Sequence, residues 1–116
     1  MRCLVINPED KSVKELQHNG DYKEIYQLIG NGCEIFQIPF SVSKDGAHRD
    51  DFYCDEGWYI KKREKKMPLT VIDGFHSPLA GRIVVLGTDI EGNACSAKIT
   101  IEELKKRITF INHTIQ

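Results

Sequence analysis

The sequence predicts an α+β fold: one domain spanning residues 1–116, with a mostly antiparallel β-sheet and two short helices packed on one face of the sheet. Three observations support this. Short apolar runs with the spacing of strands recur along the chain, and only two segments have the 3.6-residue spacing of an amphipathic helix. The most apolar short run, Ile83 to Leu86, lies between glycine-containing turns and is expected to be the central strand. A chain of 116 residues is long enough for one hydrophobic core.

The N-terminal third predicts two strands and a helix. Arg2 to Ile6 is apolar enough for a strand buried on both faces. Lys11 to His18 alternates weakly and predicts a second strand paired with the first, with a helix as the competing interpretation. Tyr22 to Ile29 predicts a helix, because Asp21 is a favourable N-cap with Glu24 in the capping-box position and Gly30 follows the last turn.

The middle of the chain predicts a strand, a loop and a hairpin. Cys33 to Phe40 is the strand, and Pro39 places its end at a sheet edge or in a departing loop. The polar segment Ser41 to Asp51 is expected to be an exposed loop. Phe52 to Cys54 and Trp58 to Ile60 flank a glycine-containing turn and predict a hairpin.

The C-terminal third predicts more strands and the second helix. Leu69 to Ile72 is a candidate strand, and Ala94 to Lys98 is expected to pair back on the central strand. Thr100 is a helix N-cap with Glu103 in the capping-box position. Thr109 to Ile115 alternates enough to be a last edge strand, with a frayed tail as the alternative.

Composition limits the possible partners and location. The net charge of -1 provides no overall basic field, so any nucleic-acid binding would depend on a local patch. The N-terminus lacks the apolar segment of a secretion signal, and no apolar run approaches the roughly 20 residues that span a bilayer. We therefore expect a cytoplasmic protein without a membrane partner. Four cysteines without paired spacing are expected to be free thiols, with no cofactor and no metal.

Four segments resemble a known family. They are INPEDKSV, GDYKEIYQLIG, CDEGW and PLAGRIVVLGTDIEG, in this order along nearly the whole chain. The sequence is similar to an uncharacterised family of small phage- and plasmid-encoded proteins, a domain of unknown function. The resemblance implies a mobile-element protein acting in the cytoplasm of a bacterial host. The family brings no accepted catalytic residues, so none is assigned.

The first candidate binding site combines aromatic rings with cations. Rings can stack on bases while cations neutralise phosphates, which would suit a nucleotide ligand. The alternative is a solubilising edge strand, because lysines prevent edge strands from pairing with other chains. The candidate ligand-binding residues here are Trp58, Tyr59, Lys61 and Arg63.

The second candidate binding site is formed by Phe75, His76 and Arg82, with the ring stacking on a ligand and Arg82 holding an anion. His76 could also act as an acid or base. Asp73 and Ser77 are neighbours of His76 in sequence, but adjacent residues on an extended chain point apart and make a poor triad.

Two further segments have a stronger structural explanation. The turn Gly87 to Asn93 could approach a phosphate through its glycines, but it carries two acids and is better explained as a hairpin turn. A set of acids with one histidine could hold a divalent ion, but a solvated loop explains it more simply. This set is His48, Asp50, Asp51, Asp55 and Glu56.

Two function classes follow. The first is a non-enzymatic phage or mobile-element protein that binds a host protein or sequesters a nucleotide signal, in the manner of an anti-defence protein. A small domain of this kind is expected to form a homo-oligomer with its pocket between subunits. The alternative is a small enzyme acting on nucleotides or phosphoesters through His76 and the acids between Asp50 and Glu56. The missing catalytic motif favours the binder.

Overall fold

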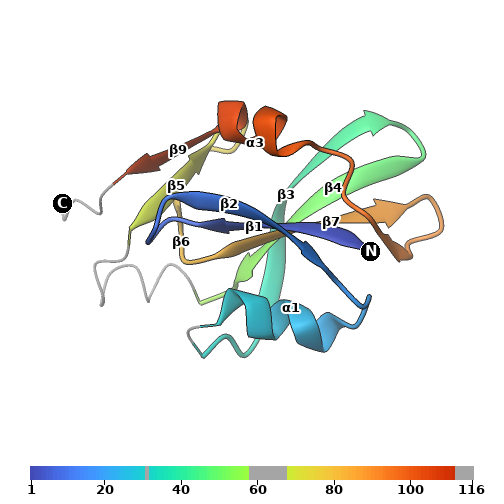
Figure 1. The fold of residues 1–116 in the computed structure, drawn as a ribbon, viewed down its shortest axis with the longest axis horizontal. Helices are drawn as coiled ribbons and strands as arrows, with labels where there is room; N and C mark the ends of the chain where they lie inside the picture. Colours follow the sequence, from blue (N-terminus) through green and yellow to red (C-terminus); the bar gives the residue numbers. More distant parts are fainter. Residues whose placement is uncertain (31, 58–67, 112–116) are drawn as a thin grey trace.

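The computed structural model describes residues 1–30, 32–57 and 68–111 (Figure 1). The fold is α+β, as predicted, and its described strands all pair antiparallel. The elements in chain order are β1 (Arg2–Asn7), β2 (Ser12–Gln17), α1 (Tyr22–Ile29), β3 (Phe36–Asp45), β4 (His48–Asp55), β5 (Leu69–Ile72), β6 (Leu79–Ala80), β7 (Ile83–Asp89), β8 (Ala94–Cys95), α3 (Ile101–Arg107) and β9 (Ile108–Ile111).

The main sheet has the strand order β2-β1-β7-β4-β3, and β8 pairs with the far end of β7. The prediction that Ile83 to Leu86 forms the central strand is confirmed, because β7 lies between β1 and β4. A second sheet has the order β6-β5-β9. The predicted C-terminal edge strand, Thr109 to Ile115, is confirmed as far as Ile111, because β9 pairs with β5 over Ile108–Ile111. Residues 112–115 of the prediction lie outside the described part of the chain.

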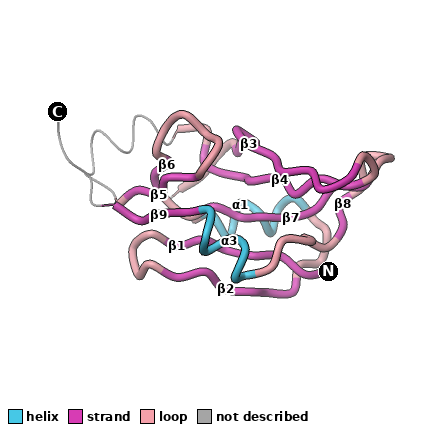
Figure 2. Tube along the Cα trace, turned by 90° about the horizontal axis from the view of Figure 1, so that it is seen from above, coloured by secondary structure: helices cyan, strands magenta, loops and turns pink. Residues whose placement is uncertain are grey.

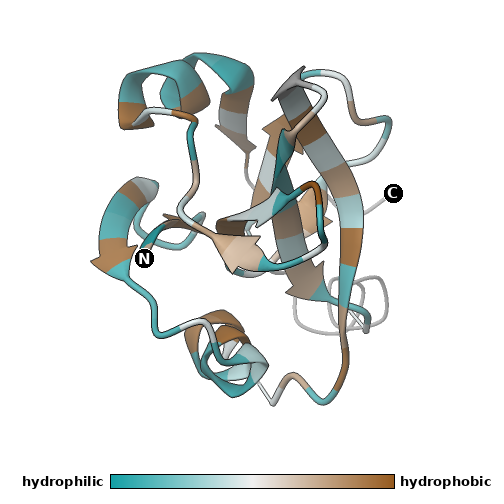
Figure 3. Ribbon diagram, turned by 90° about the vertical axis from the view of Figure 1, so that its right-hand side faces the viewer, coloured by the Kyte–Doolittle hydropathy of each residue, from teal (hydrophilic) through white to brown (hydrophobic). Residues whose placement is uncertain are grey.

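The two described helices cover opposite faces of the main sheet, so the prediction that both pack on one face is wrong (Figures 1 and 3). Leu4 and Ile6 of β1 belong to one core cluster together with Leu104 of α3. Cys3 and Val5, which point the other way, share a second cluster with the apolar side chains of α1. A strand that is apolar on both faces needs a cover on both. α1 covers one face, and α3 together with the second sheet covers the other.

Both helices begin at the predicted caps. The Asp21 side chain caps α1 by accepting a hydrogen bond from the backbone N–H of Lys23 at 2.9 Å. Glu24, which the sequence places in the capping-box position, donates its backbone N–H to the backbone carbonyl of Asp21 and not to the Asp21 side chain. Thr100 and Glu103 form the predicted reciprocal capping box. Both helix starts follow from local sequence, which is why they were predictable.

The segment Ser41 to Asp51 is not the exposed loop that its polarity predicts. It forms most of a long hairpin in which β3 pairs with β4, turning at Gly46 and Ala47. β4 pairs with β7 on its other side, so it is an interior strand of the main sheet (Figure 2). Its Asp50 and Asp51 side chains are buried. The strand Phe52–Cys54 thus pairs with β3 and β7, while its predicted partner, Trp58 to Ile60, lies outside the described residues.

The cysteines are free thiols, with Cys3 and Cys54 buried and Cys33 and Cys95 partly exposed. In the part of the chain that the structure describes, neither helix has the length and apolar character needed to cross a lipid bilayer.

Candidate functional site

A row of polar residues crosses the α1 face of the main sheet. The β1–β2 register pairs Asn7 with Ser12 and Val5 with Lys14. The β1–β7 register pairs Ile6 with Ile83, which places Arg82 next in line beside Asn7. Because side chains alternate between faces along a strand, Asn7, Ser12, Lys14 and Arg82 all lie on the face that carries Val5 and Val84.

A cavity of about 280 Å³ lies on this face, between α1 and the β1–β2 edge of the sheet. α1 packs against β7 and β4, which leaves β1 and β2 less covered on this side. The cavity is lined by Val5, Asn7, Ser12, Lys14, Leu16, Gln27, Leu28 and Arg82. It therefore combines apolar walls with amide, hydroxyl and cationic groups, as small-molecule sites do.

Arg82 is the most informative lining residue. Its Nε is buried and has no hydrogen-bond partner among the described residues. Its Nη1 lies against the C-terminal end of α1, 3.2 Å from where a side chain at Gly30 would begin. The carbonyl end of a helix favours a cation, so the guanidinium is stabilised in this place. A buried donor without an acceptor costs roughly 1–3 kcal/mol, and a ligand oxygen at Nε would recover that cost.

The charge of the cavity is positive. Among the described residues, its lining includes two cations, Arg82 and Lys14, and no carboxylate. Asp10 lies at the margin, where its side chain accepts from Ser12 Oγ and lies 3.9 Å from Lys14 Nζ. Both partners of the Lys14–Asp10 pair are well exposed, so water screens their attraction and leaves Lys14 able to turn toward an anion.

The structure does not bring the second predicted binding set together. Phe75 packs on the α3 side of the core, with its ring centroid 6.1 Å from that of Phe40. His76 is exposed, and its ring centroid lies 4.6 Å from that of Phe75. Arg82 lies against α1 on the opposite face of the sheet. The prediction that these three residues form one site is therefore wrong, because the chain passes from one face to the other between them.

The first predicted binding set lies outside the described residues. Trp58, Tyr59, Lys61 and Arg63 all fall within 58–67, so their role as ligand-binding residues stays a prediction.

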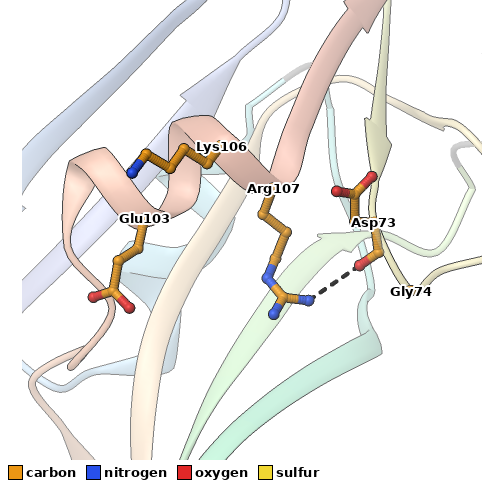
Figure 4. A pocket seen from close by; sticks show the side chains of 5 residues that line it. All are labelled: Asp73, Gly74, Glu103, Lys106 and Arg107. Atoms are coloured by element: carbon orange, nitrogen blue, oxygen red, sulfur yellow. Dashed lines mark hydrogen bonds between the residues drawn. The ribbon is translucent and has the colours of Figure 1, made fainter.

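A second cavity, of about 380 Å³, lies between the loop after β5 and α3 (Figure 4). Its lining has mixed charge: Asp73, Gly74, Glu103, Lys106 and Arg107. Arg107 Nη1 donates to the Asp73 carbonyl oxygen at 3.1 Å, and its guanidinium lies 5.9 Å from the centre of the Phe40 ring. Arg107 already contacts the Asp73 carbonyl and the Phe40 ring, and the carboxylates of Asp73 and Glu103 line the same cavity. This cavity is therefore less suited to binding an anion than the cavity at Arg82.

The solvated loop that the sequence favours for the candidate metal set is wrong for four of its five residues. His48, Asp50, Asp51 and Asp55 are buried in β4, whereas Glu56 follows the strand and is exposed. Asp50 and Asp51 are buried in β4 and point to opposite faces. Asp51 accepts hydrogen bonds from Ser41, Arg49 and Thr88. Asp50 is hydrogen-bonded to His48. Within the described residues, no group of three or more histidine, cysteine, aspartate or glutamate side chains is placed to hold a metal ion.

The segment Gly87 to Asn93 comprises the end of β7 and the turn of the β7–β8 hairpin, so the sequence's preference for a hairpin turn is confirmed. Asp89 N–H donates to the Asn93 carbonyl at 2.9 Å, and Gly92 N–H donates to the Asp89 carbonyl at 3.0 Å. The Asp89 side chain accepts from the backbone N–H groups of Glu91 and Asn93. These donors are occupied by the turn itself, so the segment offers little to a phosphate.

Comparisons with known proteins found no match among family models, curated proteins or solved structures. The resemblance to a phage and plasmid family consequently stays a prediction from the sequence.

Proposed function

We propose that this chain is a non-enzymatic binding protein whose cavity between α1 and the β1–β2 edge holds the phosphate of a small molecule, a nucleotide in particular. The observation that supports the proposal most directly is the side chain of Arg82. This residue lines a cavity that also contains Lys14 and neutral polar groups, and its buried Nε has no hydrogen-bond partner among the described residues. Guanidinium groups match phosphate oxygens with paired hydrogen bonds, which makes arginine the usual residue for such recognition.

The neighbouring residues complete the ligand's surroundings. Asn7 Oδ1 accepts from the backbone N–H of Glu9, which directs its amide NH₂ group to other acceptors. Gln27 offers a second amide, and Leu16 and Leu28 supply apolar surface for a ring or sugar. Small-molecule pockets usually enclose about 300–1,000 Å³. A cavity of about 280 Å³ fits a phosphate and the group next to it, so the rest of a nucleotide would need further surface, such as a second copy of the chain.

The biological role that we propose is sequestration. Affinity for a nucleotide without chemistry would suit a phage or plasmid protein that withdraws a host signal. The alternative, an enzyme using His76 with the acids of β4, receives less support. His76 is exposed beside Phe75, and the histidine that lies against Asp50 is His48.

The proposal is tested by calorimetric titration of the purified protein with inorganic phosphate, ADP-ribose and a cyclic dinucleotide. We expect at least one of them to bind and Arg82→Gln to weaken that binding by about ten-fold or more, because a hydrogen bond to a charged group contributes roughly 1.5–3 kcal/mol. Arg107→Gln is the matched control, since Arg107 lines the other cavity, and it should bind as the unaltered protein does.

Ligand recovered after heat denaturation then separates the two function classes. Intact ligand supports a binder, and consumed ligand supports an enzyme. Equal weakening by Arg82→Gln and Arg107→Gln, or no binding of any of the three compounds, would contradict the proposed site.

A further inference from the structure

Three strands bring a thiol, an imidazole and a carboxylate together on the α3 face of the main sheet. In the register of β4, β7 and β8, Asp50 lies opposite Gly87 and Gly87 lies opposite Cys95. His48 lies two residues before Asp50 on β4, so both side chains point to the same face. Cys95 Sγ lies 3.5 Å from His48 Nδ1, and His48 Nε2 lies 2.8 Å from Asp50 Oδ1. The β7–β8 turn and the β3–β4 turn lie side by side at this end of the molecule (Figures 1 and 2).

Gly87 makes this approach possible. A Cβ built at Gly87 would lie 2.5 Å from His48 Cε1 and 3.0 Å from Cys95 Sγ. It would also lie 2.5 Å from the Ser96 carbonyl oxygen, which belongs to the backbone and cannot rotate away. The imidazole therefore occupies the space that any other residue at position 87 would fill, between the carboxylate and the thiol.

Asp50 fixes the imidazole. Its carboxylate accepts from the backbone N–H of Ile99 at 2.8 Å and of Lys98 at 3.0 Å, and the side chain is almost fully buried. A carboxylate only accepts hydrogen bonds at neutral pH, so it selects the tautomer that carries its proton on His48 Nε2. His48 Nδ1 is then left as an acceptor facing the thiol, which is the arrangement of nucleophile, base and orienting group used in covalent catalysis.

We propose that Cys95 is a site of oxidation by small uncharged hydroperoxides, with His48 as the base and Asp50 as a positioning residue. In the step, the Cys95 sulfur attacks the terminal, hydrogen-bearing oxygen of the hydroperoxide, an S–O bond forms and the O–O bond breaks. His48 Nδ1 takes the thiol proton and returns it to the departing oxygen, which leaves as an alcohol or water. The sulfur is oxidised by two electrons to a sulfenic acid, and the peroxide is reduced by the same two.

The charges around the thiol favour an uncharged substrate. Burial raises the pKa of Cys95, and the carboxylates of Asp89 and Asp50 raise it further. The thiol is therefore protonated at rest and depends on His48 to remove its proton during the reaction. The same carboxylates would repel an anion and would oppose the oxyanion that forms when a thiol attacks an acyl carbon. A hydroperoxide forms no such intermediate, because its leaving oxygen receives the proton directly.

The alternative is that the His48–Asp50 pair only ties the segment before α3 to the sheet. A comparison within one protein separates these explanations, because Cys33 is partly exposed like Cys95 but its Sγ contacts the Ile35 carbonyl oxygen at 3.6 Å. The protein is treated with hydrogen peroxide and the sulfenic acids are trapped with dimedone. Labelling at each cysteine is then followed by mass spectrometry over time.

We expect Cys95 to be labelled at least about ten-fold faster than Cys33, because a positioned base contributes on the order of 10²–10⁴-fold and the raised thiol pKa offsets part of it. His48→Gln should bring the Cys95 rate to within about three-fold of Cys33, and Asp50→Asn should lie between. Equal labelling of both cysteines in the unaltered protein would overturn the proposal, whether or not the variants fold. An unchanged Cys95 rate in a folded His48→Gln variant would also overturn it.

Discussion

Replacing Asp50 by alanine should destabilise the protein more than replacing any exposed acid. Asp50 is 3% exposed, and its carboxylate accepts from Ile99 N–H, Lys98 N–H and His48 Nε2. Asp50→Ala removes all three acceptor contacts at once. The two backbone donors left without a partner cost roughly 1–3 kcal/mol each. We expect a loss of about 3–5 kcal/mol, a large fraction of the roughly 5–15 kcal/mol that stabilises a domain.

The assay is urea denaturation followed by circular dichroism, with the free energy of unfolding extrapolated to water. Asp50→Asn is the conservative variant: it keeps the shape and one acceptor oxygen, and should lose about half as much as Asp50→Ala. Asp73→Ala is the exposed control and should change stability by less than about 0.5 kcal/mol. If Asp50→Ala falls within about 1 kcal/mol of Asp73→Ala, the carboxylate does not hold the segment before α3 as described.

Three further predictions follow from single contacts. Gly87→Ala should destabilise the protein by about 1–3 kcal/mol in urea denaturation, because the added Cβ would overlap His48 and a backbone carbonyl. Gly46→Ala is the control and should not destabilise it, because no atom of the described residues lies within 4 Å of the added Cβ. Similar losses in the two variants would contradict the close packing of His48 against Gly87. Thr100→Ala should lose about 1 kcal/mol through its helix cap and Thr100→Ser should retain most of it, so an unaffected melting temperature in Thr100→Ala would count against the cap. Burial raises the pKa of the Cys54 thiol from 9.0 to about 12, so the folded state holds the thiol proton more tightly than the unfolded state does. The stability that this proton contributes is therefore complete below pH 9 and is lost as the pH rises toward 12. Relative to Cys54→Ala, the unaltered protein should therefore lose about 1.4 kcal/mol per pH unit in this range, and parallel pH profiles would contradict the assignment.

The elements that could be predicted from the sequence are those specified by neighbouring residues. The two helix starts follow from Asp21 and Thr100 with the spacing of apolar residues behind them. The central strand follows from an apolar run between glycines, and its burial on both faces is visible in the composition of Ile83–Leu86. These signals need no information on which distant segments meet.

The two wrong predictions about the fold, the exposed loop at Ser41 to Asp51 and the packing of both helices on one face, concern features that depend on which distant segments meet. The polar side chains of Ser41 to Asp51 form hydrogen bonds across the two strands of a hairpin. The Ser41 hydroxyl donates to the Asp51 carboxylate, and the Ser43 hydroxyl donates to the backbone carbonyl of His48. Such pairs look the same in a sequence as a solvated loop. The prediction that both helices pack on one face is wrong because the face on which a helix packs depends on the path of the chain between strands, which local sequence does not specify.

The candidate site was only partly predictable. Arg82 was expected to hold an anion, which is the role that we propose for it, but Phe75 and His76 lie on the other side of the sheet. Lys14, Asn7, Ser12 and Gln27 were not identified. The signal that could have found the first three is the β1–β2 hairpin, because pairing back from the turn after Asn7 places all of them on one face.

Nuclear magnetic resonance of the arginine side chains is the most direct test of the anion site. The Nε–Hε signal of Arg82 is followed while inorganic phosphate is added, with Arg49 as an internal control because its Nε already donates to Asp51 at 2.9 Å. A buried donor that acquires a phosphate oxygen should shift saturably while the Arg49 signal stays in place. An Arg82 signal that does not move, or that moves no more than the signal of Arg49, would contradict the proposal that this cavity binds phosphate.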